Sequence, residues 1–165
     1  MSVNYRIAQI QDSEEIYQFA EDKLRLDLKQ APKDSQSLHF EMNEMDFMMK
    51  IWESRFRKEA LEHYLKLGWS FLAYEQQGEK EVLKGFFLGQ PFLFFEGQTQ
   101  TLWVELIMAV DYKIEAELTE IAYKLSRDKH FQKVILPSSV TTLHYEKSLP
   151  FQKWSNDYVW LKTTK

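Results

Sequence analysis

Apolar and polar positions recur along this chain with two periods, and each period predicts a different kind of element. Near the N-terminus, Tyr5 to Ile10 alternates in the manner of a short strand. Asp12 then resembles a helix N-cap, and Glu15 stands three residues later as in a capping box. Helical spacing of the apolar residues that follow predicts a helix running to about Leu28. These residues are Ile16, Phe19, Ala20 and Leu24.

The middle of the chain predicts a second helix and then a hairpin. Helical character returns from about Glu41 to Leu67, and Gly68 follows as a C-cap. Trp69 to Gln76 is typical of a strand, and Val82 to Leu88 is typical of its antiparallel partner. The segment between them, Gln77 to Lys80, is typical of a turn. An antiparallel pair is therefore expected directly after the second helix.

The second half predicts a strand–helix–strand unit and a C-terminal strand. Leu102 to Val110 is nearly continuous in apolar residues, as expected of a central strand covered on both faces. Before it, the stretch from Pro91 to Phe95 either extends the preceding strand or forms an aromatic loop. The elements expected after it are an amphipathic helix from Ile114 to about Lys129, a strand at Val134–Leu136, a short helix at Thr141–Ser148 and a strand within Lys153–Lys162. The order β-α-α-β-β-β-α-β-α-β predicts an α/β fold with a sheet of mixed direction.

Composition narrows the classes of function. With 165 residues, 44% of them hydrophobic, residues 1–165 are expected to form one domain with a substantial core. The formal charge of −4 and the lack of a basic block argue against nucleic acid as a partner. The absence of cysteine excludes thiolate nucleophiles and thiolate metal sites. The four histidines lack paired metal-ligand spacing, so no metal site is expected. No apolar run is long enough to span a bilayer, and a cytoplasmic protein is expected.

Several local features resemble the GNAT superfamily of acyl-CoA N-acyltransferases. The resemblance covers most of the chain, and its most specific part is Leu143–Phe151 (LHYEKSLPF), which is similar to the family's tyrosine-bearing helix and the YEKLGF turn after it. The other similar parts are the opening strand and helix start (Tyr5–Ile16), the hairpin (Trp69–Phe86) and the strand–helix–strand core (Leu102–Leu136). The resemblance implies a GNAT-like mixed, mostly antiparallel central sheet flanked by helices.

The resemblance also implies roles for individual residues. Acetyl-CoA or another acyl-CoA would be the co-substrate, and a small-molecule amine or a protein would be the acceptor. Tyr145 matches the tyrosine that protonates the leaving thiolate, and Glu105 matches the glutamate that acts as base for the amine. Each has a structural alternative. A tyrosine on a short helix commonly packs its ring, and a glutamate in such a strand often marks an edge position or an ion pair.

The coenzyme would be held where the apolar strand passes into the following helix, at Ala109, Val110, Tyr112 and Lys113. In the family, a glycine-rich loop there binds the pyrophosphate through backbone N–H groups. This chain has no glycine from Gln98 to its last residue, and at this position it offers acidic residues, Glu115 and Glu117, instead of glycine. Lys113 either contacts a phosphate or is simply solvated.

Two functional hypotheses therefore stay open. The first is an acyl-CoA-dependent N-acetyltransferase with an atypical or degenerate coenzyme site. The second is a catalytically inactive GNAT-fold module that binds a small ligand or a protein. Its binding surfaces would be the apolar stretch Pro91–Phe95, which could also form a homodimer contact, and a methionine stripe. At helical spacing such a stripe is more often ordinary core. The stripe comprises Met42, Met45, Met48 and Met49.

Overall fold

One mixed β-sheet forms the centre of the computed structural model, which describes residues 2–30, 58–94, 99–138 and 151–164. Among these residues the sheet contains seven strands. The strands are β1 (Val3–Ile7), β2 (Phe71–Gln77), β3 (Lys80–Phe94), β4 (Thr99–Ala109), β5 (Lys133–Pro137), β6 (Gln152–Lys153) and β7 (Tyr158–Lys162). The helices are α1 (Ser13–Gln30), α3 (Lys58–Leu67) and α4 (Tyr112–Asp128), with a 3-10 turn η1 (Ile10–Asp12) before α1.

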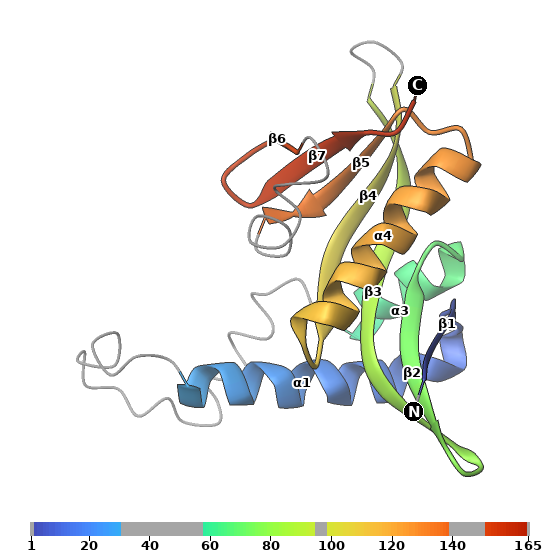
Figure 1. Ribbon diagram of the computed structural model, residues 1–165, viewed down its shortest axis with the longest axis vertical. Coiled ribbons are helices and arrows are strands. Elements are labelled where there is room, and N and C mark those ends of the chain that lie inside the picture. The colour runs from blue at the N-terminus through green and yellow to red at the C-terminus, as the bar shows by residue number, and fades with distance from the viewer. Residues whose placement is uncertain (1, 31–57, 95–98, 139–150, 165) are drawn as a thin grey trace.

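The strands follow the spatial order β1-β2-β3-β4-β5-β7-β6. β4 and β5 pair in parallel, and the other neighbouring strands pair antiparallel. The parallel pair is connected by α4, which crosses the sheet between them (Figure 1). The expected mixed, mostly antiparallel sheet flanked by helices is therefore confirmed.

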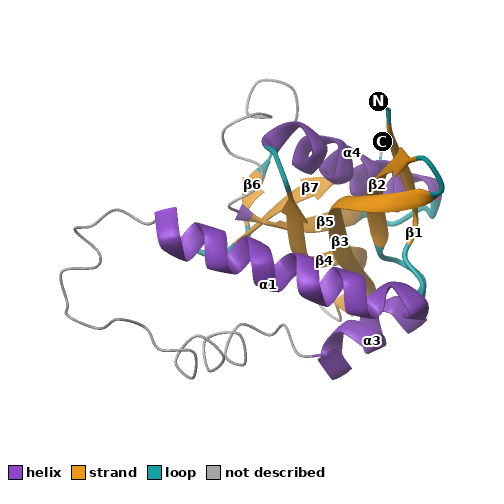
Figure 2. Ribbon diagram, turned by 90° about the horizontal axis from the view of Figure 1, so that it is seen from below, coloured by secondary structure: helices purple, strands orange, loops and turns teal. Residues whose placement is uncertain are grey.

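Helices cover both faces of the sheet, as Figure 2 shows, with α4 on one side and α1 and α3 on the other. The alternation of side chains along β3 divides the core between them. Phe87 packs in the cluster that includes Ile114, Leu118 and Ala122 of α4. Phe86, the preceding residue, belongs to the cluster formed with α1 and α3. The 3.6-residue period of α4 thus places its apolar stripe against one face of the sheet.

Several predicted boundaries are confirmed. Gly68 has a φ of +75° and its N–H donates to the carbonyl of Leu65, as a helix C-cap should. β3 continues through Pro91 to Phe94, so the apolar stretch extends the strand. The predicted helices at Glu41–Leu67, apart from α3, and at Thr141–Ser148 lie outside the described residues, and so does the methionine stripe. In the part of the chain that the structure describes, no helix combines the length and apolar character that a membrane span needs.

One prediction near the N-terminus is wrong. Asp12 does not cap α1 in a box with Glu15. It ends the 3-10 turn, and its carboxylate accepts hydrogen bonds from the guanidinium of Arg6 and the N–H of Gln9. The C-terminal strand predicted within Lys153–Lys162 is confirmed as β7, and the short strand β6 precedes it. The N–H groups of Trp154 and Ser155 both donate to the carbonyl of Tyr158, which folds the segment into the β6–β7 hairpin.

Candidate functional site

The second half of β4 lies beside an opening in the sheet. β4 and β5 pair only from Thr101 to Trp103, where Trp103 meets Ile135. Among the described residues, β4 then continues to Ala109 and pairs with β3 but no longer with β5. Figure 1 shows the two strands diverging after their paired ends. Backbone N–H and C=O groups on the β5 side of β4 are therefore placed to bind an extended ligand, because a strand edge offers alternating donors and acceptors.

A β-bulge interrupts β4 at the start of this opening. Leu88 of β3 faces Leu106, but the next residue, Gly89, faces Val104, so Glu105 is the extra residue on β4. A glycine fits here because a Cβ at position 89 would lie 2.7 Å from the carbonyl oxygen of Trp69. Bulges re-aim side chains and bend the strand that carries them. The bulge therefore sets the direction of the Glu105 carboxylate.

The carboxylate of Glu105 has a fixed neighbour. Its Oε2 accepts a hydrogen bond of 2.8 Å from the indole N–H of Trp103. The Trp103 ring in turn packs against Tyr158 at 4.9 Å and Phe92 at 6.2 Å between centroids. We call Phe92, Trp103 and Tyr158 the aromatic cluster. Glu105 is half-buried beside this cluster, so its carboxylate is oriented but still reachable.

The connection from β4 to α4 is only two residues long, Val110 and Asp111. Asp111 is the N-cap of α4, and its Oδ1 accepts the N–H of Ile114 at 2.9 Å. Its backbone carbonyl accepts the N–H of Glu115 at 3.2 Å. The N–H of Val110 donates to the carbonyl of Lys84 at 2.8 Å. Three amides of this junction therefore already have acceptors within the chain.

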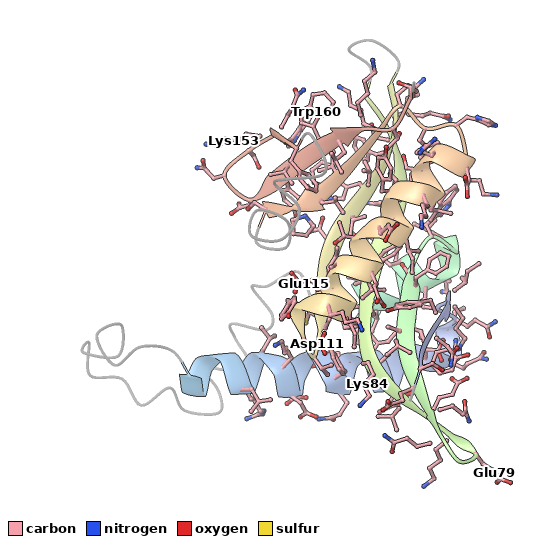
Figure 3. All side chains as sticks on the ribbon, viewed as in Figure 1. Glu79, Lys84, Asp111, Glu115, Lys153 and Trp160 are labelled. Carbon is pink, nitrogen blue, oxygen red and sulfur yellow. The ribbon has the colours of Figure 1, made fainter. Side chains whose placement is uncertain are left out.

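Acidic side chains surround the same helix start. Figure 3 shows Asp111 and Glu115 at the first turn of α4. One turn further on, Glu117 accepts a hydrogen bond from the hydroxyl of Tyr5. The pKa of Tyr5 is raised above its ordinary value by burial first, and then by this bond and the charges of Glu117 and Asp111. Asp111 and Glu117 therefore both act on Tyr5. The carboxylates of Asp111, Glu115 and Glu117 outnumber the ammonium of Lys113 at this helix start.

The structure brings most of the predicted site residues to these two places. Glu105 lies at the bulge. Ala109 is the buried last residue of β4, while Val110 and Tyr112 are 49% and 66% exposed at the junction. Lys113 is exposed in the first turn of α4. Tyr145 lies outside the described residues, so its position relative to Glu105 stays a prediction.

Sequence reasoning missed two residues of the site. Asp111 as an N-cap could have been found, because aspartate directly before an amphipathic helix is a strong start signal. Trp103 as the partner of Glu105 also had a signal, because residues two apart on a regular strand share a face. The bulge that makes Glu105 the extra residue depends on pairing with β3, which no local pattern reveals.

Comparison by sequence finds no relative of this chain. No protein-family model matches it, and the curated proteins include no match.

Comparison by structure does find similar proteins. An N-acetyltransferase, PaiA from Thermoplasma acidophilum, solved with coenzyme A, has a TM-score of 0.62 at 14% identity over 98% of this chain and 99% of its own. A GNAT family acetyltransferase from Brucella melitensis, solved with acetyl-CoA, has a TM-score of 0.57 at 15% identity over 99% and 90%. A chain of the NatC complex bound to Gag peptide and CoA has a TM-score of 0.56 at 12% identity over 99% and 100%. The chain therefore has the GNAT fold.

Proposed function

We propose that this chain is an N-acyltransferase that takes its acyl group from a thioester lying in the opening between β4 and β5. Glu105 is the general base for the amine acceptor. The observation that carries the proposal is the bulge. It places a half-buried carboxylate, oriented by the indole of Trp103, where β4 leaves its pairing with β5. A base must be held within hydrogen-bond reach of the proton that it removes, and a fixed carboxylate meets that need.

The chemistry follows from these groups. A neutral amine attacks the thioester carbonyl, the C–N bond forms and the C–S bond breaks. Glu105 accepts the proton that the amine nitrogen loses. Tyr145 is proposed to return a proton to the departing sulfur, since a tyrosine is protonated at neutral pH. This second role rests on the sequence resemblance alone.

Coenzyme A, which the fold implies as donor, fits this chain only in part. Its extended arm suits the strand edge beyond Trp103, where β4 has no recorded partner in β5 among the described residues. Its pyrophosphate does not suit the start of α4. The Asp111 carboxylate occupies the position of an anion there, and the junction amides of Val110, Ile114 and Glu115 are already hydrogen-bonded. We therefore write the donor as a thioester and leave its carrier to the next subsection.

The test is a transfer assay. Purified protein is incubated with acetyl-CoA or S-acetylpantetheine and a panel of primary amines and peptides with free N-termini, and the released thiol is measured. Glu105→Gln should lower kcat by a factor of about 10² or more, because general-base catalysis contributes about 10² to 10⁴. Glu79→Gln, at the exposed turn between β2 and β3, is the matched control and should retain activity. Turnover of Glu105→Gln within about threefold of wild type removes Glu105 from the mechanism.

A second candidate function is a binding module without acyl transfer. The Asp111 cap at the start of α4 favours it, because the N–H of Ile114 is bonded to that carboxylate and a coenzyme phosphate would have to compete for it. Absence of thiol release with both donors across the acceptor panel supports this candidate over the first. The cytoplasmic location, the homodimer through the aromatic strands and the identity of the acceptor stay predictions.

A further inference from the structure

We propose that the start of α4 selects against coenzyme A, so that the donor is an acyl thioester whose carrier has no phosphate where β4 meets α4. Pantetheine and shorter neutral thiols belong to this class. That the carrier delivers an acyl group rests on the proposed function. The selection itself rests on the geometry of Asp111 and its neighbours.

The first part of the argument concerns hydrogen bonds. A pyrophosphate binds at a helix start when several backbone N–H groups there lack partners and converge on one point. Here the N–H of Ile114 donates to Asp111 Oδ1 at 2.9 Å, and the N–H of Glu115 donates to the Asp111 carbonyl at 3.2 Å. A phosphate oxygen could take the first of these donors only by displacing a carboxylate that is covalently tethered to the same site. Such a tethered group competes at a high effective concentration.

Chain length gives the second part. The N–H of Val110 donates to the carbonyl of Lys84 at 2.8 Å, which fixes the residue before Asp111 onto the sheet. Only Val110 and Asp111 connect β4 to α4, and neither is glycine. A short connection without glycine has little freedom to wrap around an anion while the Val110 bond is kept. The N–H groups of Val110, Ile114 and Glu115 therefore serve hydrogen bonds within the chain.

Charge gives the third part. The helix dipole supplies about half of a positive charge, which one carboxylate offsets. Asp111 and Glu115 stand at the first turn (Figure 3). Glu117 lies two residues after Glu115 on α4. The nearby ammonium of Lys84 is paired with Glu75 at 3.2 Å. The exposed ammonium of Lys113, in the same first turn, offsets only one of the three carboxylates. A pyrophosphate would add negative charge next to these carboxylates, whereas a neutral carrier would not.

The opening itself remains suited to a neutral arm. Beyond Trp103 the described β4 has β3 on one side and no recorded β5 pairing on the other, as far as Ala109. About six residues of strand, at about 3.3 Å each, give an edge of about 20 Å. An amide-bearing arm can hydrogen-bond along such an edge as an added strand does. The thioester would then lie near Glu105, and the distal end of the arm would stop at Asp111.

The experiment compares carriers and a charge variant. Binding of CoA and of pantetheine is measured by calorimetry, and kcat/KM is measured with their acetyl thioesters. Wild type should bind CoA no more tightly than pantetheine. Asp111→Ser removes the charge but keeps a good N-cap residue. It should raise kcat/KM for acetyl-CoA about tenfold and leave S-acetylpantetheine within about twofold, because only the former carries charge to this position.

Asp111→Asn serves as the second variant if the serine variant folds poorly, since it also keeps a capping side chain. A wild-type preference for CoA over pantetheine of tenfold or more overturns the inference and leaves the acyltransferase proposal standing. Binding of pantetheine without that preference, but with no transfer to any amine, supports the inference and removes the proposed function. If neither CoA nor pantetheine binds, both the inference and the proposed function are overturned.

Discussion

Gly89→Ala tests the backbone geometry that positions Glu105. Gly89 lies opposite Val104, directly beside the bulge, and its N–H donates to Ser70 Oγ at 3.1 Å. An added Cβ would lie 2.7 Å from the carbonyl oxygen of Trp69, which real Cβ atoms essentially never approach so closely. The clashing atom is backbone, so no side-chain rotation can relieve the contact. Either β3 or the segment that carries Trp69 must shift, and a shift of β3 also moves the bulged strand β4 that pairs with it.

The cost can be worked from this contact. Overpacking of a close-packed site costs about 1–3 kcal/mol. Replacing glycine with alanine also restricts the unfolded chain, which offsets about 0.4–1 kcal/mol. The free energy of unfolding should therefore fall by about 1–2 kcal/mol. With a urea m-value of about 2 kcal/mol per molar, the unfolding midpoint should move down by about 0.5–1 M.

The assay is urea unfolding followed by tryptophan fluorescence, with the m-value compared between variants. Gly78→Ala is the comparison variant, because a Cβ at position 78 meets nothing within 4 Å and only the positive φ of +65° opposes it. The fall in the free energy of unfolding of Gly78→Ala therefore measures backbone strain without a steric clash. A midpoint for Gly89→Ala within about 0.2 M of wild type, at an unchanged m-value, contradicts the close approach of the Trp69 carbonyl to position 89.

Two further predictions concern titrating groups at β1. Burial alone would raise the pKa of Asp12, but the bonds from Arg6 and from the Gln9 N–H outweigh it and the pKa is lowered. The ionised Asp12 carboxylate therefore stabilises the fold at a pH above the ordinary aspartate pKa, and this stability is lost as pH falls through the lowered pKa. In urea unfolding, Asp12→Asn should cost about 2 kcal/mol at pH 7 and progressively less below about pH 4. Because the pKa of Tyr5 is raised, wild type should lose stability as pH rises above about 10, and Tyr5→Phe, which also loses its bond to Glu117, should lack that loss in thermal melts. An equal cost of Asp12→Asn at pH 3 and pH 7, or identical alkaline limbs for Tyr5→Phe and wild type, contradicts these assignments.

Elements with a strong local period could be predicted from the sequence. Ile114, Leu118 and Ala122 recur every four residues, and all three are buried on the face of α4 that meets the sheet. Leu102 to Val110 was predicted as a central strand, and β4 ends one residue earlier. The fold followed from the order of such elements, because a strand–helix–strand unit in this order builds a parallel pair next to an antiparallel hairpin.

Features set by long-range pairing could not be predicted. The aspartate at position 12 matched a capping pattern, yet Arg6 and Gln9 bind its carboxylate, because β1 brings that guanidinium alongside the 3-10 turn. The bulge at Glu105 is a feature of the pairing with β3, where Gly89 stands sixteen positions earlier in the chain and lies close to the carbonyl of Trp69. Local propensity cannot predict these contacts, because they join residues that are distant in the sequence.

The start of α4 shows how one sequence choice decides between stability and ligand binding. Every helix begins with N–H groups that lack partners, and they must bond to the chain, to water or to a ligand. An aspartate N-cap stabilises the protein by about 1 kcal/mol relative to alanine, and its charge is favourable at the positive end of the helix dipole. In this chain the N–H of Ile114 bonds to the Asp111 side chain, so the same N–H cannot bind a phosphate at the same time. A helix that binds a coenzyme phosphate in this way keeps the group available and forgoes the internal cap. The opening along β4 and the fixed carboxylate of Glu105 are independent of that choice. A chain of this fold can therefore keep the geometry for acyl transfer while changing which carrier it accepts.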